Sequence, residues 1–408
     1  MKKTKFKPLD FKGEFSDQFD FIDGRYKFRF NLATHELEFI RIDRKMYSIG
    51  DWEPLKDRTL KDIKKDLGSE GMKLSVANIK DHIESSYISE DYDPFNEYFA
   101  SLEPWGGHVD YIKQLADTVT VNKSDQDLFY EMFKRFLIAT VDCLLNDSKA
   151  NDVCLVFQGR QGIGKSRWMR SLMPKEFKSK YFYEGEIQTS NKDHEEYLSA
   201  FWFIHLDELE SVSSNKIGSL KSFITRQYIQ HRKAFGIYRS KFIRRASFLG
   251  SVNNDTFLTD TTGNRRWLVF KAKELNYNHN LDIDNVWSQA HSLLLSGERY
   301  WLSQEEIESM NERNERFRNQ SKEEEMMLDN FEMLEDGQSN GEWMSATDMI
   351  GRMIDFNPKL AIGLRNGVLG KAASKYEKKS KTIKGSKKYF VRYIGRTEVP
   401  QDDDNLPF

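Results

Sequence analysis

Residues 153–166 have the sequence VCLVFQGRQGIGKS, a short apolar run followed by a glycine-rich loop. A continuous apolar run such as Val153 to Gln158 is typical of a parallel strand that is buried on both faces. The residues after the loop, Ser166 to Leu172, have the composition of a helix. Strand, glycine loop and helix in this order predict an α/β fold in which the loop lies at the carboxyl end of a strand.

The loop has the spacing GxxxxGK[ST], which predicts phosphate binding because backbone N–H groups of a glycine-rich turn can point toward an anion. A chance glycine-rich turn is the alternative, and the flanking strand and helix count against it. We therefore expect the loop to bind ATP and Mg²⁺. Lys165 would reach the β and γ phosphates, and Ser166 would be a ligand of the metal. The expected nucleotide contacts are Gly159, Gly162, Gly164, Lys165, Ser166 and Arg167.

Two further apolar runs end on polar residues. Phe201 to Leu206 is followed by Asp207, and Ala246 to Val252 is followed by Asn253. Strands that alternate with helices predict a three-layer α/β sheet, whose site lies where the strands end.

The acid pair Asp207 and Glu208 suits ATP hydrolysis. Asp207 would hold Mg²⁺, and Glu208 would polarise the attacking water. An exposed acidic loop is the alternative, but the pair follows the next predicted strand after the loop. Asn253 would orient that water or contact the γ-phosphate, although an Asn at this position is often only a strand cap.

Arg265 and Arg266 lie in the segment TTGNRRW, residues 261–267. A guanidinium group suits the negative charge of a transferring phosphoryl group, and Arg266 is the preferred candidate of the two. Such arginines usually act across a subunit boundary, so they predict an oligomeric ring. A surface arginine pair in a basic turn is the alternative.

Residues 221–245, KSFITRQYIQHRKAFGIYRSKFIRR, combine basic and aromatic side chains. This composition is typical of a loop that binds single-stranded DNA by base stacking and phosphate contacts. A solvated basic hairpin with core aromatics is the alternative. The candidate DNA contacts here are Lys221, Arg232, Lys233, Phe235, Tyr238, Arg239 and Lys241.

The pattern along the rest of the chain predicts several attached regions. Residues 25–42 alternate like a β-hairpin, residues 60–85 have the spacing of two short helices, and residues 127–145 predict a buried helix. The predicted regions are a small α/β domain at 1–93, a helical connector or oligomerisation region at 94–150, the ATPase core at 151–275, a helical region at 276–322, an acidic linker at 323–342, a basic winged-helix-like module at 343–396 and an acidic disordered tail at 397–408.

Composition limits the class of protein. The chain has 408 residues, a formal charge of -2 and two cysteines, Cys143 and Cys154, without metal-ligand spacing. The most apolar run, Phe136 to Leu145, is too short to span a bilayer, and the N-terminus lacks a signal-peptide pattern. We therefore expect a cytoplasmic protein without a membrane partner. Basic residues gather between Lys371 and Arg396, and Lys384, Lys387 and Lys388 are further candidate DNA contacts.

The motifs GRQGIGKS, FWFIHLDELE, LKSFITRQ and FLGSVNNDTFLTDTTGNRRW resemble the virulence-associated protein E family, a group of AAA+/superfamily 3-like ATPases of phages and mobile elements. The resemblance covers about residues 90–320 and includes YDPFNEYFASLEPWGG upstream, where the usual Trp-Asp-Gly is Trp105-Gly106-Gly107. It implies that Lys165 and Ser166 belong to the Walker A motif and that Asp207 and Glu208 belong to the Walker B motif. It also implies that Asn253 is the sensor 1 residue and that Arg266 is the arginine finger. Lys221 would match the lysine after Walker B.

The resemblance implies a hexameric DNA helicase that acts in replication of a phage or mobile element, with single-stranded or forked DNA as substrate. The alternative is an ATP-switched initiator or helicase loader that binds DNA without unwinding it. A defence ATPase of such an element is a weaker third hypothesis. Primase activity is doubtful, because the N-terminal hundred residues lack a cluster of acids or Cys/His.

The last eight residues, QDDDNLPF, are similar to the acidic tip of bacterial single-stranded-DNA-binding protein. Such a tip would recruit host proteins through the phenyl ring of its last residue and through its carboxylates. The alternative, which we weigh equally, is an ordinary polar tail. The residues concerned are Asp402, Asp403, Asp404, Pro407 and Phe408.

Overall fold

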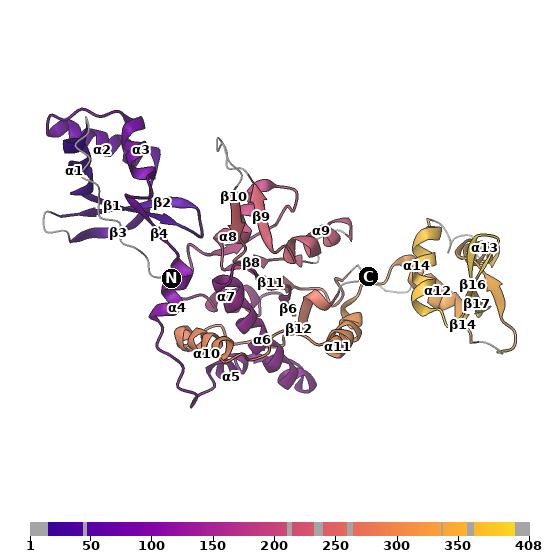
Figure 1. Cartoon of the computed structure of the whole chain (residues 1–408). Helices are drawn as coiled ribbons and strands as arrows, with labels where there is room; N and C mark the ends of the chain where they lie inside the picture. Colours follow the sequence, from indigo (N-terminus) through magenta and orange to yellow (C-terminus); the bar gives the residue numbers. More distant parts are fainter. Residues whose placement is uncertain are drawn as a thin grey trace, which may run out of the picture. The chain divides into compact units, whose positions relative to one another are not determined.

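The computed structural model describes residues 15–43, 47–209, 214–231, 240–258, 264–335, 338–356 and 363–395. These residues divide into two compact units. The first contains the described residues up to Asp255 and those from 264 to 315, and the second contains 256–258 and those from 316 onward. Figure 1 shows the elements of both units.

The first unit begins with a mixed α/β region. Its strands are β1 (Tyr26–Asn31), β2 (Glu36–Ile42), β3 (Ser48–Pro54) and β4 (Ser89–Tyr92), in the sheet order β3-β2-β1-β4, and its helices are α1 (Ser16–Asp23), α2 (Asp57–Ser69) and α3 (Val76–Glu84). The predicted hairpin and the two predicted helices are confirmed. Strands β1 and β2 pair antiparallel, with Phe28 opposite Phe39, and both rings are buried with Ile63 of α2 and Ile79 of α3.

Helices connect this region to the central sheet. They are α4 (Pro94–Ser101), α5 (Tyr111–Ala116) and α6 (Gln126–Leu145). Helix α6 is buried along most of its length, as its apolar residues on several faces predict. A short pair of strands, β5 (Val119–Thr120) and β13 (Glu274–Leu275), joins the segment before α6 to the segment after the sheet.

The centre of the first unit is a five-stranded, fully parallel sheet with the order β12-β6-β11-β8-β7. Its strands are β6 (Cys154–Gln158), β7 (Phe182–Glu184), β8 (Phe203–Leu206), β11 (Ser247–Val252) and β12 (Trp267–Lys271). The three apolar runs predicted as strands are β6, β8 and β11. Because all five strands run in one direction, their carboxyl ends lie at one edge of the sheet.

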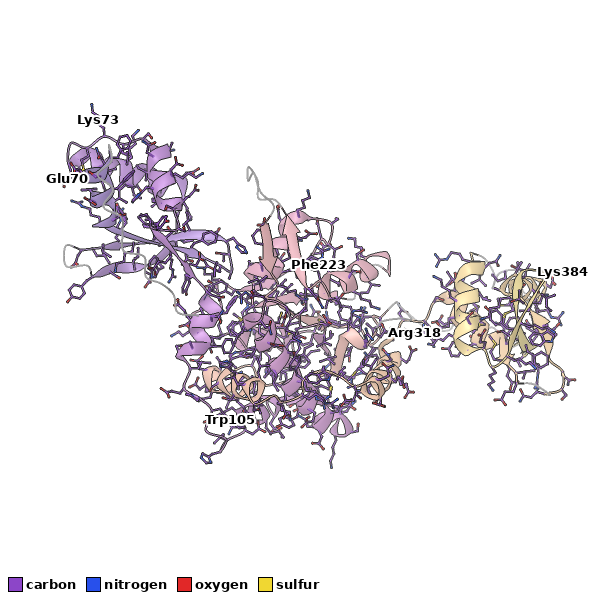
Figure 2. The ribbon with its side chains drawn as sticks, in the orientation of Figure 1. Glu70, Lys73, Trp105, Phe223, Arg318 and Lys384 are labelled. Atoms are coloured by element: carbon purple, nitrogen blue, oxygen red, sulfur yellow. The ribbon has the colours of Figure 1, made fainter. Side chains whose placement is uncertain are left out.

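Helices pack on both faces of the sheet, because both faces are apolar. Trp168 of α7 (Lys165–Ser171) packs against Phe133 of α6 and edge-to-face against Phe157 of β6, and α10 (Ile283–Leu295) belongs to the same core. On the other face, Phe223 of α9 (Ser214–Ile224), labelled in Figure 2, meets Phe248 of β11 with ring centres 6.1 Å apart.

Further elements of the first unit lie around the sheet and after it. Helix α8 (Lys192–Ala200) lies beside the antiparallel strands β9 (Tyr228–His231) and β10 (Ser240–Ile243), and α11 (Gln304–Asn314) follows α10. The two arginines predicted to act on phosphate lie in a 3-10 turn, η3 (Asn264–Arg266), directly before β12.

The second unit contains helices α12 (Lys322–Asn330), α13 (Ala346–Phe356) and α14 (Asn366–Tyr376), and strands β14 (Phe331–Met333), β15 (Glu342–Met344), β16 (Ser380–Ile383) and β17 (Ser386–Tyr393). Strand β17 is central and pairs antiparallel with β14, β15 and β16. Met327, Met349, Leu369 and Val391 form the middle of the core.

The structure corrects one regional expectation. Residues 323–342, expected to be an acidic linker, form α12 and β14 and begin β15. The acids Glu323 and Glu324 are buried because arginines pair with them: Glu323 with Arg365 at 3.1 Å, and Glu324 with Arg318, which is labelled in Figure 2.

None of the helices that the structure describes has both the length and the apolar composition needed to cross a bilayer.

Candidate functional site

The predicted phosphate loop connects β6 to α7. Gly162 and Gly164 have φ angles of 84° and 95°, the left-handed region that side-chain-bearing residues rarely adopt. Gly164 also precedes α7 directly and is its N-cap residue. The two glycines therefore allow the backbone to turn sharply between the end of the strand and the start of the helix.

Lys165 is the first residue of α7, and its side chain points back into the loop. It is 6% exposed, and its Nζ donates to the carbonyl oxygens of Gly159 at 2.7 Å and Arg160 at 3.1 Å. Nζ also donates to Oδ1 of Asn253 at 2.9 Å. Two residues predicted from separate parts of the sequence thus meet, because β6 and β11 are parallel neighbours that end at the same edge.

Asp207 and Glu208 follow β8 at the same edge of the sheet. The hydroxyl of Ser251, in the neighbouring strand β11, donates to Oδ1 of Asp207. Both acids are exposed, and Glu208 has a φ of 51°, which is uncommon for a residue with a side chain. The sequence interpretation missed Ser251, although it lies two residues before Asn253 and therefore on the same face of its strand.

A cavity of about 650 Å³ opens beside these acids. Asp207 and Glu208 line it together with residues 185–190 and with Lys216 and Ser219 of α9. The segment 185–190 follows β7, a strand that the sequence interpretation did not predict.

A hydrogen-bonded cluster around Glu184 lies next to this cavity. Glu184, the last residue of β7, accepts hydrogen bonds from the buried ring of His205 at 3.2 Å and from Arg170 of α7. The bond with His205, aided by Arg170, lowers the pKa of Glu184 to about 2. The carboxylate therefore stays charged and connects α7, β7 and β8.

The structure does not bring Arg265 and Arg266 to the loop of their own chain. Strand β12 pairs with β6 in parallel, with Trp267 opposite Cys154 and Lys271 opposite Gln158. The arginines precede β12, whereas the loop follows β6, so a whole strand of roughly 15 Å separates them. They lie at the amino edge of the sheet.

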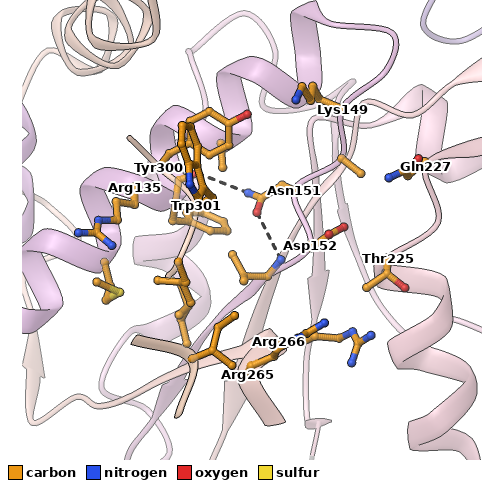
Figure 3. A pocket seen from close by; sticks show the side chains of 18 of the residues that line it. Arg135, Lys149, Asn151, Asp152, Thr225, Gln227, Arg265, Arg266, Tyr300 and Trp301 are labelled. Carbon is orange, nitrogen blue, oxygen red and sulfur yellow. Dashed lines mark hydrogen bonds between the residues drawn. The ribbon is translucent and has the colours of Figure 1, made fainter. Parts of the chain in front are cut away.

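Arg265 and Arg266 line a pocket of about 540 Å³. Figure 3 shows this pocket from close by. Asn151, before β6, donates to Thr140 of α6 and to Ser247 of β11, both at 3.1 Å, and so anchors one wall. Trp301, which is 59% exposed, also lines the pocket. The Nε of Arg266 is buried and has no hydrogen-bond partner among the residues the structure describes.

Lys221 requires a correction. It was expected to contact DNA, but it is only 6% exposed, and its Nζ donates to Oδ1 of Asn264 at 3.3 Å. A buried ammonium cannot reach a DNA phosphate in this conformation. Its position instead ties α9 to the residue directly before Arg265 and Arg266.

Several predicted contacts cannot be placed. Arg232, Lys233, Phe235, Tyr238 and Arg239 lie outside the described residues, as do the side chain of Lys241 and the C-terminal tail. In the second unit, Lys384 occupies the turn between β16 and β17 with a φ of 50° (Figure 2). Lys387 pairs with Glu377 at 2.6 Å and Lys388 with Asp348 at 3.0 Å, so neither lysine is free of counter-charge.

Comparison with known proteins gives a family. The virulence-associated protein E-like domain matches residues 101–319. Among solved structures, one of the NrS-1 C terminal region in its A form without ligand is 13% identical, covers 90% of this chain and 96% of its own, and has a TM-score of 0.43. A second structure of that region is 11% identical, with the same coverage and a TM-score of 0.41. No curated protein matches the chain. Because the domain match extends over more than half of its residues, the chain belongs to the virulence-associated protein E-like family.

Proposed function

We propose that this chain is a P-loop ATPase that forms a ring and moves along DNA in the replication of a phage or mobile element. The observation that carries the proposal is the hydrogen bond from buried Lys165 to Asn253, at the edge of the sheet where Asp207 and Glu208 also lie. A lysine, an amide and two carboxylates around a glycine-rich turn form the set that phosphoryl transfer from ATP to water requires.

The residues of this edge fit ATP and Mg²⁺. Ser166 and Asp207 carry hard oxygen donors, which Mg²⁺ prefers, and bound metal would neutralise negative charge on the phosphates. Lys165 would exchange its bonds to the loop carbonyls for phosphate oxygens. Glu208 is exposed and would accept the proton of the attacking water, while Asn253 would hold that water or the terminal phosphate.

ATP hydrolysis with and without single-stranded DNA tests the proposal. We expect Lys165→Ala to reduce hydrolysis by about 100-fold or more, since it removes a cation that acts on transferring phosphate. Lys192→Ala, an exposed lysine at the start of α8, is the matched control and should hydrolyse ATP like the wild type. The proposal that the chain moves along DNA would be contradicted by one result. In that result the wild-type protein hydrolyses ATP, but its hydrolysis does not respond to DNA and it displaces no strand from a fork.

The second unit supports the alternative of an ATP-switched initiator or loader. Its three helices and the β16–β17 hairpin suit the winged-helix-like module expected from the sequence. Lys371, Lys378 and Lys384 are exposed and take part in no ion pair between described residues. Lys387 donates to Ser374 of α14 at 3.2 Å, so the hairpin and the helix contribute to one basic surface.

Replacing Lys371, Lys378 and Lys384 together by alanine should weaken binding of duplex DNA and reduce its salt dependence, because each phosphate contact releases counterions. The control replaces Lys61, Lys64 and Lys65, three exposed lysines of α2. The loader is favoured if wild-type protein binds DNA through this surface but displaces no strand. Unchanged DNA binding in the Lys371, Lys378 and Lys384 variant would show that this surface does not bind DNA.

A further inference from the structure

An aromatic ring covers the phosphate loop on the side away from the acids. A β-carbon built on Gly164 would lie 2.3 Å from Cδ1 and 2.7 Å from Cε1 of Tyr277, so the ring packs directly on the α-carbon of this glycine. Only a residue without a side chain allows such an approach. Tyr277 is half-buried, which leaves part of its ring open to solvent.

The segment that carries Tyr277 is fixed by backbone hydrogen bonds directly before the ring. It follows β13, which pairs with β5, and the N–H of Asn276 donates to the carbonyl of Thr118 at 2.9 Å. The indole of Trp168 in α7 donates to the hydroxyl of the same Thr118 at 2.7 Å. The ring and the helix that follows the loop are therefore positioned by a common neighbour.

Arg167 extends this aromatic surface. Its guanidinium carbon lies 5.3 Å from the centre of the Tyr277 ring, and its Nη1 is 3.4 Å from the tyrosine hydroxyl. Arg167 is exposed, and it follows the two loop residues, Lys165 and Ser166, that the proposed function assigns to the phosphates and the metal.

The order of the strands decides which end of a nucleotide this surface would meet. Asn253 and Asp207 follow β11 and β8, which lie on one side of β6, whereas Tyr277 follows β12, on the other side. The carbonyl of Ala272, just after β12, would lie 2.5 Å from a β-carbon on Gly159, so the β12 side directly borders the loop. With the terminal phosphate near Asn253 and Asp207, the nucleoside has to leave toward Tyr277.

We propose that Tyr277, together with Arg167, forms the surface on which the base of the bound nucleotide stacks. The inference rests on the proposed function, because it takes the loop to be a nucleotide site. A ring face beside a guanidinium suits any flat heterocycle, and stacking on such a ring contributes about a ten- to hundred-fold gain in affinity. Tyr277 is then a base-binding residue that adds affinity for a nucleotide, whereas Lys165 acts on the phosphates.

Calorimetric titration of the full chain with ATP and with inorganic triphosphate separates the two roles, because triphosphate has no base. Tyr277→Ala should weaken ATP binding about ten-fold or more and leave triphosphate binding unchanged within about two-fold. Tyr277→Phe should bind ATP nearly as the wild type does, because it keeps the ring. Lys165→Ala should weaken both ligands.

Two further variants guard against a misfolded loop. Tyr277→Leu keeps an apolar cover over Gly164 but removes the ring face, so it should lose ATP affinity like Tyr277→Ala while unfolding at the wild-type temperature. Tyr87→Ala removes a tyrosine that is 84% exposed elsewhere in the chain and should change neither ligand.

The outcomes are distinct. Equal weakening of ATP and triphosphate by Tyr277→Leu overturns the inference, since the ring would then only support the loop. Unchanged ATP binding in both the Ala and Leu variants overturns it as well. Wild-type protein that binds neither ligand removes the proposed function, and the base surface with it.

Discussion

Lys165 shows how a buried charge is tolerated next to a loop. Its ammonium has three donors, and two backbone carbonyls and the amide oxygen of Asn253 accept from it. These bonds replace the water that burial removes. The same bonds hold the side chain at the point where the strand ends, so the cation is in position before any ligand arrives.

Gly164 and Gly162 differ in a way that mutation can measure. Both have positive φ angles, but a β-carbon on Gly162 would meet nothing within 4 Å, whereas one on Gly164 would strike Tyr277. We expect Gly162→Ala to lower the free energy of unfolding by about 1–2 kcal/mol from backbone strain alone, and Gly164→Ala to lower it further.

Urea unfolding measures this difference, and the double variant Gly164→Ala with Tyr277→Ala identifies its cause. The double variant should regain the additional free energy of unfolding that Gly164→Ala loses through its clash with the ring. It should not regain the part that is lost to backbone strain at residue 164. Equal losses in Gly162→Ala and Gly164→Ala would show that the ring moves away without cost.

Glu184 predicts a pH dependence of stability. Hydrogen bonds from His205 and Arg170 lower its pKa in the folded state to about 2, while an unfolded chain has a glutamate pKa of about 4.3. A lowered folded-state pKa stabilises the fold above the unfolded value, and this stability is lost as pH falls from about 4.3 to 2. The wild type should therefore lose stability more steeply over this range than Glu184→Gln.

Unfolding free energies measured from pH 7 down to the acid limit check this expectation. Glu186→Gln is the control, because Glu186 is exposed and its ion pair with Lys216 is a surface contact. The control should follow the wild-type curve. A Glu184→Gln curve parallel to the wild type would exclude a role for this carboxylate.

At the scale of elements, the buried carboxylate of Glu324 connects α12 to α14. Glu324 accepts two bonds from Arg318 and one from the hydroxyl of Tyr376 in α14 at 2.7 Å. Removal of one partner from a buried pair leaves the other charge without compensation, so Glu324→Gln should cost about 3 kcal/mol or more. Glu325→Gln, the exposed neighbour on the same helix, should cost little.

Amide hydrogen exchange locates the effect. Exchange should accelerate in α12 and α14 of Glu324→Gln, and the central sheet should exchange as in the wild type, since it lies in the other unit. Unchanged protection of α12 would mean that its apolar residues alone hold it in place.

At the scale of the whole molecule, the position of Arg266 is the reason to propose a site that two subunits share. The arginine lies at the amino edge of the sheet, and Lys165, Asp207 and Glu208 lie at the carboxyl edge. A chain therefore cannot supply both sets to one phosphate. In a ring of head-to-tail contacts, the arginine of one subunit would face the loop of the next.

Mixing two inactive variants tests this arrangement. Lys165→Ala and Arg266→Ala should each hydrolyse ATP poorly, yet a mixture assembled together should recover activity at roughly a quarter of its interfaces. Lys165→Ala mixed with Glu208→Gln should recover nothing, because both residues belong to the same edge of one chain. Recovery in the control mixture, or none in the first, would contradict the shared site.

Local patterns were sufficient to predict much of the fold. The apolar runs before the glycine loop, Asp207 and Asn253 are strands, and their polar ends meet because parallel strands end at one edge. Strands β7 and β12 were not predicted, because β7 has only three residues and β12 follows a basic turn directly. The acids of α12 concealed a helix whose Met327 belongs to the core.

The sequence by itself determined the glycine loop and the strands β6, β8 and β11, because glycine conformations and hydrophobic period are properties of neighbouring residues. Only the tertiary structure decided which side chains meet. Lys221 is buried against Asn264, Tyr277 lies on Gly164, and Arg266 lies a strand's length from Lys165. These relations depend on strand order and register between distant segments, and spacing along the chain carries no information about either.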